Sequence, residues 1–348
     1  MSQTTNAKLP FASDYMQGAH PAILDALTKT NLQPEPGYGS DSFCARAREQ
    51  IRKACACPGA DIYFFSGGTQ TNAVCISALL APYQGVLSAD TGHIAGHEAG
   101  AVECGGHKVL SLPHEDGKLT ADAVRRACAA WNQDENRDHI VMPGMVYISH
   151  PTENGTLYTL DELRALRAVC DDYRIPLYLD GARLAYALAT PSNDVTLPDL
   201  AVLCDAFYIG GTKCGALLGE ALVLPDPSRL PHFFSIMKQR GAVLAKGRLL
   251  GIMFDTLFTD DLYQKIGRPA IAAADRIRRA LKEKGYVLPY ETPTNQIFVT
   301  LEDSRMKELS EYVSFGFWEK SDETHTVVRF ATSWATTEED VRALIERL

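Results

Sequence analysis

Lys213 is the residue of this chain with the clearest capacity for covalent chemistry. It lies in the stretch Gly-Gly-Thr-Lys-Cys-Gly over 210–215, directly after the apolar, β-prone run Phe-Tyr-Ile over 207–209. A lysine at the end of a buried strand is partly desolvated, and desolvation favours the neutral amine that attacks carbonyl carbons. The flanking glycines leave room for a flat group beside the amine. The stretch predicts a Schiff-base lysine, with a surface-loop lysine as the alternative.

A second motif, Ser-Gly-Gly-Thr-Gln-Thr-Asn over 66–72, follows a predicted strand and opens a predicted helix. Gly68 and Thr69 at the start of a helix would offer free N–H groups to an anion, and the helix dipole would add to this. The motif lacks the lysine of a nucleotide P-loop, and it differs from the dinucleotide fingerprint. It predicts a site for a phosphate monoester, although an ordinary strand-to-helix turn would also explain it.

Asp180, in Asp-Gly-Ala-Arg over 180–183, follows the apolar run Pro-Leu-Tyr-Leu. A carboxylate at the end of a buried strand needs a partner, and a protonated pyridine nitrogen would serve. Arg183 could reach an anionic group of a ligand. The alternative is an aspartate that caps a helix and pairs locally with Arg183.

Histidine also follows a strand end, in Asp-Thr-Gly-His-Ile over 90–94. His93 could stack on a flat ring or move protons, and His97 offers the same chemistry one helical turn later. Glu98 could orient either ring. Ordinary polar packing is the alternative for each histidine.

The turn His-Pro-Thr-Glu-Asn-Gly over 150–155 should face the same crevice. His150, Thr152 or Glu153 could line that crevice, although a plain turn explains His150 at least as well. Arg329 lies in the apolar strand predicted over 327–330, where an unpaired arginine would be costly. A substrate carboxylate is a suitable partner for it, and a structural ion pair is the alternative.

Alternating strands and helices position these residues. Such alternation with short connections predicts an α/β fold with a mostly parallel sheet covered on both faces, and ligands bind beyond the carboxyl ends of its strands. We expect strands at 61–65, 85–89, 108–112, 145–149, 176–180, 207–209 and 221–224. We expect helices at 22–28, 42–56, 69–80, 94–99, 120–131, 159–173, 181–189 and, as one long apolar helix, about 240–258.

The pattern changes after about residue 268. A helix over 270–284, a strand over 294–300, another helix and a strand over 326–330 predict a small α+β domain. Its last helix should begin near Thr336, which has capping-box spacing to Glu339. We therefore expect an N-terminal segment (1–30), a large domain (31–262) and a small C-terminal domain (263–348).

Composition limits the functional classes. The 348 residues are 46% hydrophobic and 22% charged, with a net charge of −9, and basic runs are absent, so we expect no nucleic-acid partner. No apolar run reaches membrane-spanning length, and the polar opening lacks a signal-peptide core. The nine cysteines include no Cys-x-x-Cys pair, so we expect no metal, reduced thiols and a cytoplasmic location.

Four stretches in this order give the chain a family resemblance: Gly-Gly-Thr-Gln-Thr-Asn over 67–72, His93-Ile94, Asp-Gly-Ala-Arg-Leu over 180–184 and Gly-Gly-Thr-Lys over 210–213. Together they resemble the low-specificity L-threonine aldolases. These belong to the wider β-eliminating lyase family of pyridoxal-phosphate enzymes, which have the aspartate-aminotransferase type of fold. The resemblance runs from about Phe11 to the C-terminus.

The resemblance implies a role in holding pyridoxal 5′-phosphate for each matching residue. Lys213 would form the Schiff base with the cofactor, Asp180 would face the pyridine nitrogen and His93 would stack on the ring. Gly68 and Thr69 match the phosphate-binding turn. The resemblance assigns a cofactor contact to Arg183 also, and Thr212 could serve the phosphate.

The resemblance also implies how substrate and subunits are arranged. Arg183 and Arg329 match two arginines near the substrate carboxylate, and Ser13 matches an N-terminal serine that touches the same group. Lys238 and Lys246 are candidates for reaching the phosphate of a neighbouring subunit. A homo-oligomer is implied, as a homodimer or as a dimer of dimers (homotetramer).

The implied activity is cleavage of L-threonine, L-allo-threonine or a related β-hydroxy amino acid to glycine and an aldehyde. His93, or a water held by Glu98 or Glu153, could take the proton of the β-hydroxyl group, and the sequence does not choose among them. Another β-eliminating lyase or an aminotransferase would use the same lysine and aspartate. A non-catalytic, cofactor-binding regulator is a third alternative, although no basic DNA-binding segment accompanies the chain.

Overall fold

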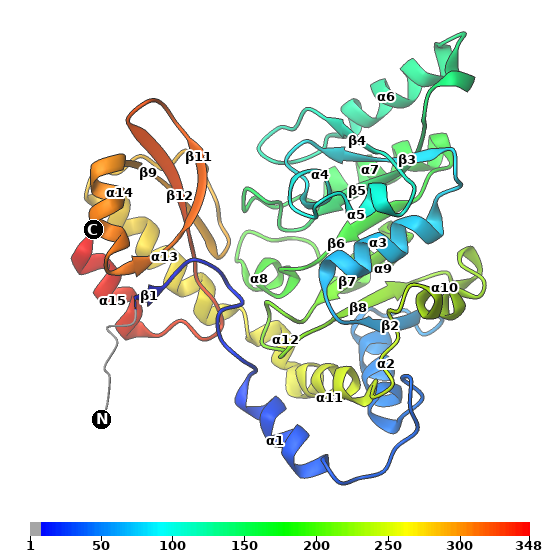
Figure 1. Cartoon of the computed structure of the whole chain (residues 1–348), viewed down its shortest axis with the longest axis horizontal. Coiled ribbons are helices and arrows are strands. Elements are labelled where there is room, and N and C mark those ends of the chain that lie inside the picture. Colours follow the sequence, from blue (N-terminus) through cyan, green and yellow to red (C-terminus); the bar gives the residue numbers. More distant parts are fainter. Residues whose placement is uncertain (1–7) are drawn as a thin grey trace.

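A seven-stranded sheet forms the centre of the computed structural model, which describes residues 8–348 (Figure 1). The strand order is β2-β8-β7-β6-β5-β3-β4. Its strands are β2 (Asp61–Phe65), β3 (Gln84–Ala89), β4 (Val109–Leu112), β5 (Met142–Ser149), β6 (Leu177–Asp180), β7 (Ala206–Gly210) and β8 (Glu220–Leu224).

The sheet is mostly parallel, as the alternation of strands and helices predicts. Strands β3 to β7 pair in parallel, and β8 runs antiparallel to both of its neighbours, β7 and β2. Ser149 at the end of β5 is in register with Asp180 at the end of β6. The polar residues that follow these strands therefore meet at one edge of the sheet.

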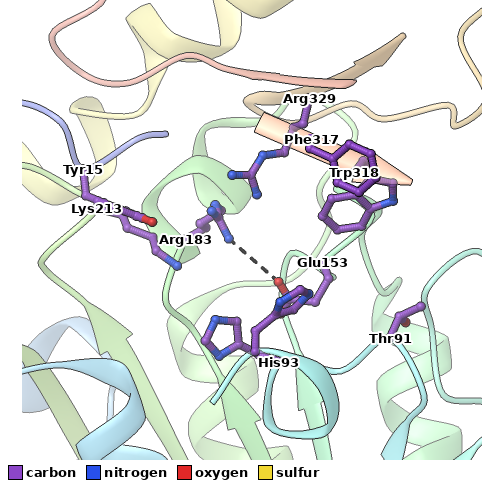
Figure 2. A pocket seen from close by; sticks show the side chains of 10 residues that line it. Tyr15, Thr91, His93, Glu153, Arg183, Lys213, Phe317, Trp318 and Arg329 are labelled. Atoms are coloured by element: carbon purple, nitrogen blue, oxygen red, sulfur yellow. Dashed lines mark ion pairs between the residues drawn. The ribbon is translucent and has the colours of Figure 1, made fainter. Parts of the chain in front are cut away.

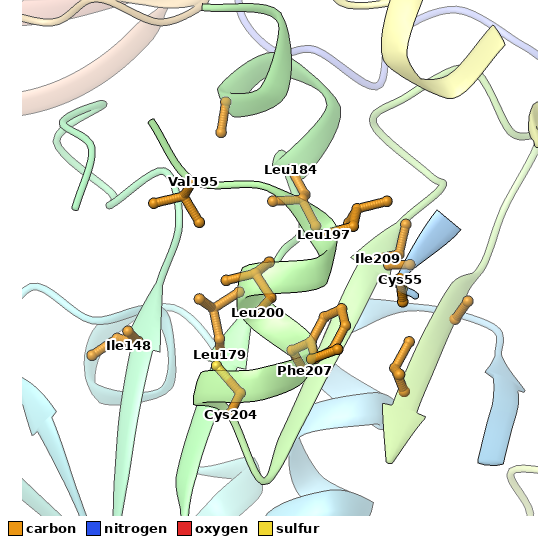
Figure 3. Close-up of a cluster of buried hydrophobic side chains, with 14 of the residues drawn as sticks. Cys55, Ile148, Leu179, Leu184, Val195, Leu197, Leu200, Cys204, Phe207 and Ile209 are labelled. Carbon is orange, nitrogen blue, oxygen red and sulfur yellow. The ribbon is translucent and has the colours of Figure 1, made fainter. Parts of the chain in front are cut away.

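Helices cover both faces of the sheet. Leu177 and Leu179 of β6 face one hydrophobic cluster, and Tyr178 between them faces another, because successive side chains of a strand alternate. Figure 3 shows part of the first cluster, where Leu179 and Phe207 lie beside Leu200 of α9 (Leu197–Leu203).

The helices and single turns of this part of the chain are listed here in sequence order: α1 (Pro21–Thr30), α2 (Ser42–Ala54), α3 (Gly68–Leu79), α4 (His93–Gly96), α5 (Ala101–Cys104), α6 (Ala121–Gln133), η1 (Arg137–His139), α7 (Leu160–Tyr173), α8 (Leu184–Ala189), α9 (Leu197–Leu203), η2 (Pro227–Arg229), α10 (Phe233–Gln239), α11 (Arg248–Leu257), η3 (Thr259–Asp261) and α12 (Leu262–Lys265).

A second, three-stranded antiparallel sheet with the order β11-β12-β9 lies beside the first and has its own core (Figure 1). The N-terminal strand β1 pairs in parallel with β10 and so joins this part of the molecule. The elements are β1 (Leu9–Pro10), α13 (Arg268–Glu283), β9 (Gln296–Glu302), α14 (Asp303–Ser310), β10 (Val313–Ser314), β11 (Gly316–Lys320), β12 (His325–Ala331) and α15 (Glu338–Arg347).

Several details of the sequence-based prediction are wrong, two of which concern helix limits. Of the long helix expected over 240–258, only α11 is helical: α10 ends at Gln239, before the expected range, and the chain from there to Gly247 is not helical. Gly241 lies in this segment, and its φ of +66° is left-handed and incompatible with a continuous α-helix. The capping box of the last helix is formed by Thr337 and Asp340, one residue later than expected, because the Thr336 hydroxyl accepts a hydrogen bond from the Ser333 amide. The division into domains stays a prediction.

None of the helices within residues 8–348 has the length and apolar content needed to cross a membrane. All nine cysteines are free thiols, and most are buried. In the same described part of the chain, no group of three or more His, Cys, Asp or Glu side chains is placed to hold a metal ion.

Candidate active site

Two adjoining cavities, of about 520 and 380 Å³, lie at the carboxyl ends of the parallel strands. The larger one extends to the small sheet, from which Phe317, Trp318 and Arg329 face the residues of the large sheet (Figure 2). The two cavities share six lining residues, so they form one continuous site. The residues predicted from sequence that line one or both cavities are Gly68, Thr69, His93, His97, Glu153, Asp180, Arg183, Thr212, Lys213 and Arg329. Ser13, which was also predicted, does not line either cavity.

Lys213 lies in a tight turn between β7 and β8. The amides of Gly211 and Thr212 both donate to the Gly219 carbonyl, each at 3.0 Å, and the Tyr186 hydroxyl donates to the Lys213 carbonyl at 2.6 Å. The backbone is thus held from both sides while the side chain extends into the cavities. Its Nζ lies 6.0 Å from the centre of the Tyr15 ring.

Asp180 ends β6 and is the most densely hydrogen-bonded carboxylate of the site. It accepts from Tyr208 Oη at 2.5 Å, Tyr147 Oη at 2.7 Å, Asn72 Nδ2 at 3.0 Å and the Ala182 amide at 3.0 Å. Burial alone would raise the pKa of Asp180, but the charge of His93 and these donors lower it below the ordinary value. Asp180 is therefore a stable buried anion that faces the smaller cavity.

Asn72 connects Asp180 to His93 through a chain of hydrogen bonds. Its Nδ2 also donates to Glu98 Oε1 at 2.8 Å, and the same oxygen lies 2.8 Å from His93 Nδ1. Burial alone would lower the pKa of His93, but the bond to Glu98 and the charges of Glu153 and Asp180 raise it above the ordinary value. Glu98 thus orients His93, while His97 lies with its ring centre 5.8 Å from that of His93.

The first turn of α3 forms one wall of the smaller cavity. Gly67 precedes the helix without a side-chain cap, so the opening N–H groups remain available to an anion. A Cβ atom at Gly68 would lie 2.9 Å from the Tyr208 hydroxyl oxygen, so only glycine fits there without displacement. This geometry supports the predicted phosphate site.

Thr212 and Glu220 lie together in the smaller cavity. The Thr212 hydroxyl donates to Glu220 Oε1 at 2.8 Å and accepts from the Gly219 amide at 2.9 Å, while Glu220 Oε2 accepts from the Gly211 amide at 2.9 Å. Burial raises the pKa of Glu220 to about 8. Glu220 therefore braces the turn that carries Lys213.

Arg329 of β12 enters the larger cavity beside the N-terminal segment. Its Nη1 donates to Gln296 Oε1 at 3.0 Å and its Nη2 to the Ala12 carbonyl at 3.3 Å, whereas its buried Nε has no partner among residues 8–348. The buried Ser13 hydroxyl, next along the chain from Ala12, likewise has none within the same residues. Unpaired buried donors are costly, and a carboxylate would satisfy both groups.

Arg183 lines both cavities, but an internal partner holds its guanidinium. Its Nε and Nη2 donate to the two oxygens of Asp14 at 2.7 and 3.1 Å, and Asn295 Nδ2 donates to the same carboxylate at 2.9 Å. Although burial alone would raise the pKa of Asp14, the charges of Arg183 and Lys213 lower it to about 2. A second carboxylate, that of Glu153, has its Oε2 4.0 Å from Arg183 Nη1 (Figure 2).

The three candidate residues of the turn after β5 have different surroundings in the structure. The His150 ring lies between Asn193 Oδ1, at 3.2 Å, and the Tyr158 amide, and burial lowers its pKa to about 4. His150 is therefore a structural residue of the turn, in agreement with the plain-turn alternative. The Thr152 hydroxyl bonds to Thr156. Of the three candidates in this turn, Glu153 lines the cavities.

Several residues of the site were not predicted from the sequence. Asn72 belongs to a recognised motif but carried no assigned role. In the sequence, Tyr147 and Tyr208 look like ordinary residues of predicted strands. Asp14 is 169 positions away from Arg183, so their ion pair could not be predicted. Phe317 and Trp318 lie in β11, a strand that was not predicted because its sequence, Gly-Phe-Trp-Glu-Lys, lacks an apolar alternation.

The donor set fits pyridoxal phosphate on chemical grounds. A buried anion stands beside the cavity to hold a ring nitrogen protonated, an uncapped helix start is available to a phosphate, and a lysine amine is available to an aldehyde. Burial raises the pKa of the Glu220 carboxyl in the same cavity to about 8, which favours its neutral form beside an anionic cofactor.

Comparisons with known proteins agree with this geometry. Residues 10–304 match the model of the beta-eliminating lyase family. The chain is 30% identical to a low specificity L-threonine aldolase of a Pseudomonas species, over 98% of this chain and 97% of that protein, and 30% identical to the Pseudomonas aeruginosa protein of the same name, over 96% and 95%.

Solved structures give the same picture. A Leishmania major threonine aldolase superposes with a TM-score of 0.94 and 41% identity, covering 97% of each chain. The aspartate aminotransferase of Thermus thermophilus superposes with a TM-score of 0.73 at 16% identity, covering 98% of this chain and 90% of that one. The latter likeness shows that the fold is of the aspartate-aminotransferase type.

Proposed function

The chain belongs to the beta-eliminating lyase family, and from this premise we propose that it is a pyridoxal-phosphate-dependent aldolase. The proposed reaction is cleavage of L-threonine or L-allo-threonine to glycine and acetaldehyde. The observation that carries the proposal is that one continuous site combines Lys213, the buried Asp180 anion and the open start of α3 with the unpaired Nε of Arg329.

The residues of the smaller cavity would hold the cofactor. Lys213 supplies the amine for its aldehyde, Asp180 holds the ring-nitrogen proton, Gly68 and Thr69 bind the phosphate and His93 lies against the ring. When bound, pyridoxal phosphate supplies an electron sink for the bond that breaks at Cα of the amino acid. The network through Asn72 and Glu98 keeps the Asp180 anion and the His93 ring in fixed orientations.

The larger cavity would bind the substrate. Arg329 and Ser13 hold the carboxylate, and this anchor decides which bond of Cα is oriented for cleavage. Arg183 supports the carboxylate site electrostatically, because Asp14 already occupies two of its N–H groups. Phe317 and Trp318 of β11 close the site on the side of the small sheet.

Product analysis tests the proposed function directly. Purified holoenzyme is incubated with L-threonine and separately with L-allo-threonine, and products are identified by mass spectrometry. We expect glycine and acetaldehyde. Ammonia and 2-oxobutyrate as the main products would place the protein among eliminating lyases, and amino-group transfer to an added 2-oxo acid would make it an aminotransferase.

Cofactor binding is tested separately from turnover. The purified protein should be yellow, and borohydride reduction should attach the cofactor to Lys213, as peptide mass spectrometry would show. Protein that remains colourless after addition of pyridoxal phosphate would overturn the cofactor assignment. Bound cofactor without any turnover would instead support the regulatory alternative.

We further propose a homo-oligomer, either a homodimer or a dimer of dimers. The cavity residue Tyr15 is 57% exposed, and the neighbouring surface includes the exposed Met16. Lys238, whose Nζ lies 4.0 Å from the centre of the Tyr38 ring, and the exposed Lys246 stay candidates for a contact with a second subunit. An active monomer in light scattering at assay concentration would contradict this. A cytoplasmic location is part of the same proposal.

A further inference from the structure

Glu153 is a cavity carboxylate to which the proposed function assigns no part in holding cofactor or substrate. It lies in the turn after β5 and lines both cavities, with its side chain 11% exposed. Within residues 8–348 it is the one acidic side chain that lines the larger cavity. A buried carboxylate ordinarily has hydrogen-bond donors or a close cation.

The one cation that forms an ion pair with Glu153 in the described part of the chain is shared with another carboxylate. Glu153 Oε2 lies 4.0 Å from Arg183 Nη1, whereas Asp14 binds Nε and Nη2 of the same guanidinium at 2.7 and 3.1 Å. Arg183 therefore neutralises Asp14 first. Glu153 keeps its oxygens directed toward the cavity, where Figure 2 shows it between Arg183 and His93.

Of the two carboxylates beside Arg183, Glu153 is the one available to a bound substrate. Asp14 lines neither cavity, and both of its oxygens accept from Arg183. The charges of Arg183 and Lys213 also lower the pKa of Asp14 to about 2, against burial, which makes it a poor proton acceptor. Glu153 lines both cavities and faces the space that the substrate would occupy.

We propose that Glu153 is the catalytic base that takes the proton of the substrate β-hydroxyl group. This inference rests on the proposed aldolase function. The O–H bond breaks and its proton moves to a Glu153 oxygen; the electron pair of that bond forms the C=O of the aldehyde; and the Cα–Cβ bond breaks, leaving its pair on Cα. A proton then joins Cα to give glycine, so atoms and electrons balance without an oxidant or reductant.

The other titratable groups of the site are less suited to this step. Glu98 is engaged by Asn72 and His93 and does not line either cavity. His93 has Nδ1 bound to Glu98, and in the proposed function its ring lies against the cofactor. Asp180 lines the smaller cavity, where the proposed function assigns it to the cofactor ring nitrogen, and it does not line the larger one.

The test compares two reactions of the Glu153→Gln holoenzyme, which keeps the size of the side chain. Cleavage of L-threonine needs a base at the β-hydroxyl group, whereas exchange of a glycine α-hydrogen with D₂O, followed by NMR, does not. We expect kcat for cleavage to fall by about 10²- to 10⁴-fold. We expect glycine exchange, and cofactor affinity measured by absorbance titration, to stay within about threefold of wild type.

Matched variants separate loss of the base from other effects. Glu153→Asp keeps a carboxylate and should recover part of the cleavage rate. Glu115→Gln removes one charge from an exposed acid outside both cavities and should leave both reactions unchanged. Formate added to Glu153→Ala should restore cleavage without changing glycine exchange.

Two results would overturn the assignment of Glu153. One is cleavage by Glu153→Gln within about tenfold of the wild-type rate. The other is an equal fall in cleavage and glycine exchange, which would make Glu153 a positioning residue. If the wild-type enzyme exchanges glycine but produces no aldehyde from L-threonine, then the proposed aldolase function has failed, and the role of Glu153 falls with it for that separate reason.

Discussion

Replacing Glu220 by glutamine measures how strongly burial in the cofactor cavity disfavours a charged carboxyl group. Burial raises the pKa of Glu220 from 4.5 to about 8, against the lowering effects of Thr212, the Gly211 amide and Lys213. Because the folded-state pKa exceeds the unfolded-state value, the stabilisation is fully present below about pH 4.5 and is lost as the pH rises through about 8. The free energy of unfolding should therefore decrease with pH in this window.

The magnitude follows from the difference of about 3.5 between the two pKa values. Each pH unit corresponds to about 1.4 kcal/mol, so the wild-type protein should lose up to about 5 kcal/mol across the window. Glutamine cannot titrate there. Its carbonyl can still accept from the Gly211 amide, and its NH₂ group can donate to the Thr212 hydroxyl, so the turn before Lys213 keeps its bracing.

The assay is urea unfolding of both proteins without cofactor, followed by circular dichroism and tryptophan fluorescence from pH 5 to pH 8. All other titrating groups are common to both proteins, so the difference in unfolding free energy reports Glu220. From pH 5 to pH 8 we expect the unfolding free energy of Glu220→Gln to rise by about 3.5 kcal/mol relative to that of the wild-type protein. A difference that stays constant within about 0.5 kcal/mol would refute the reasoning.

Three further substitutions test other parts of the site. Arg329→Ala should raise KM for L-threonine by about 30- to 160-fold, equal to about 2–3 kcal/mol for a charged hydrogen bond, with cofactor absorbance intact; loss of folding in circular dichroism would instead support a structural ion pair. Gly68→Ala places a Cβ atom 2.9 Å from the Tyr208 hydroxyl, so the Kd for pyridoxal phosphate in absorbance titrations should rise at least about tenfold, and an unchanged Kd would contradict the geometry. Tyr208→Phe removes one donor from Asp180 and should lower the unfolding free energy by about 1–2 kcal/mol in urea titrations; equal midpoints and slopes would show that the bond contributes nothing.

The large sheet and its polar edge were predictable because local patterns encode them. Several predicted buried strands are followed by a charged residue or a glycine-rich turn. Because the carboxyl ends of parallel strands lie at one edge of a sheet, these residues can be predicted to lie together even when no long-range contact is known. Lys213, Asp180 and His93 therefore converge in the structure as expected. The prediction of one helix over 240–258 failed because apolar composition does not reveal the left-handed Gly241 or the non-helical segment that continues to Gly247.

The remaining contacts depend on tertiary structure that periodicity does not encode. Asp14 looks like any acid near an N-terminus until it meets Arg183 and Asn295 from distant segments. Glu220 begins an antiparallel strand, whose start happens to lie beside the carboxyl ends of the parallel strands. Such residues could be found only from the folded arrangement.

Strand β1 has a consequence for how the protein is made. Leu9 and Pro10 pair with Val313 and Ser314, and the Phe11 carbonyl accepts a hydrogen bond from the Ala331 amide. During synthesis the first of these segments leaves the ribosome some three hundred residues before its partners exist. The strands around Lys213 can be complete while Ser13 and Arg329 are still apart. A nascent chain would therefore acquire its cofactor-binding half first and its substrate-binding half only near termination, and a bulky N-terminal fusion should interfere with the second event and spare the first.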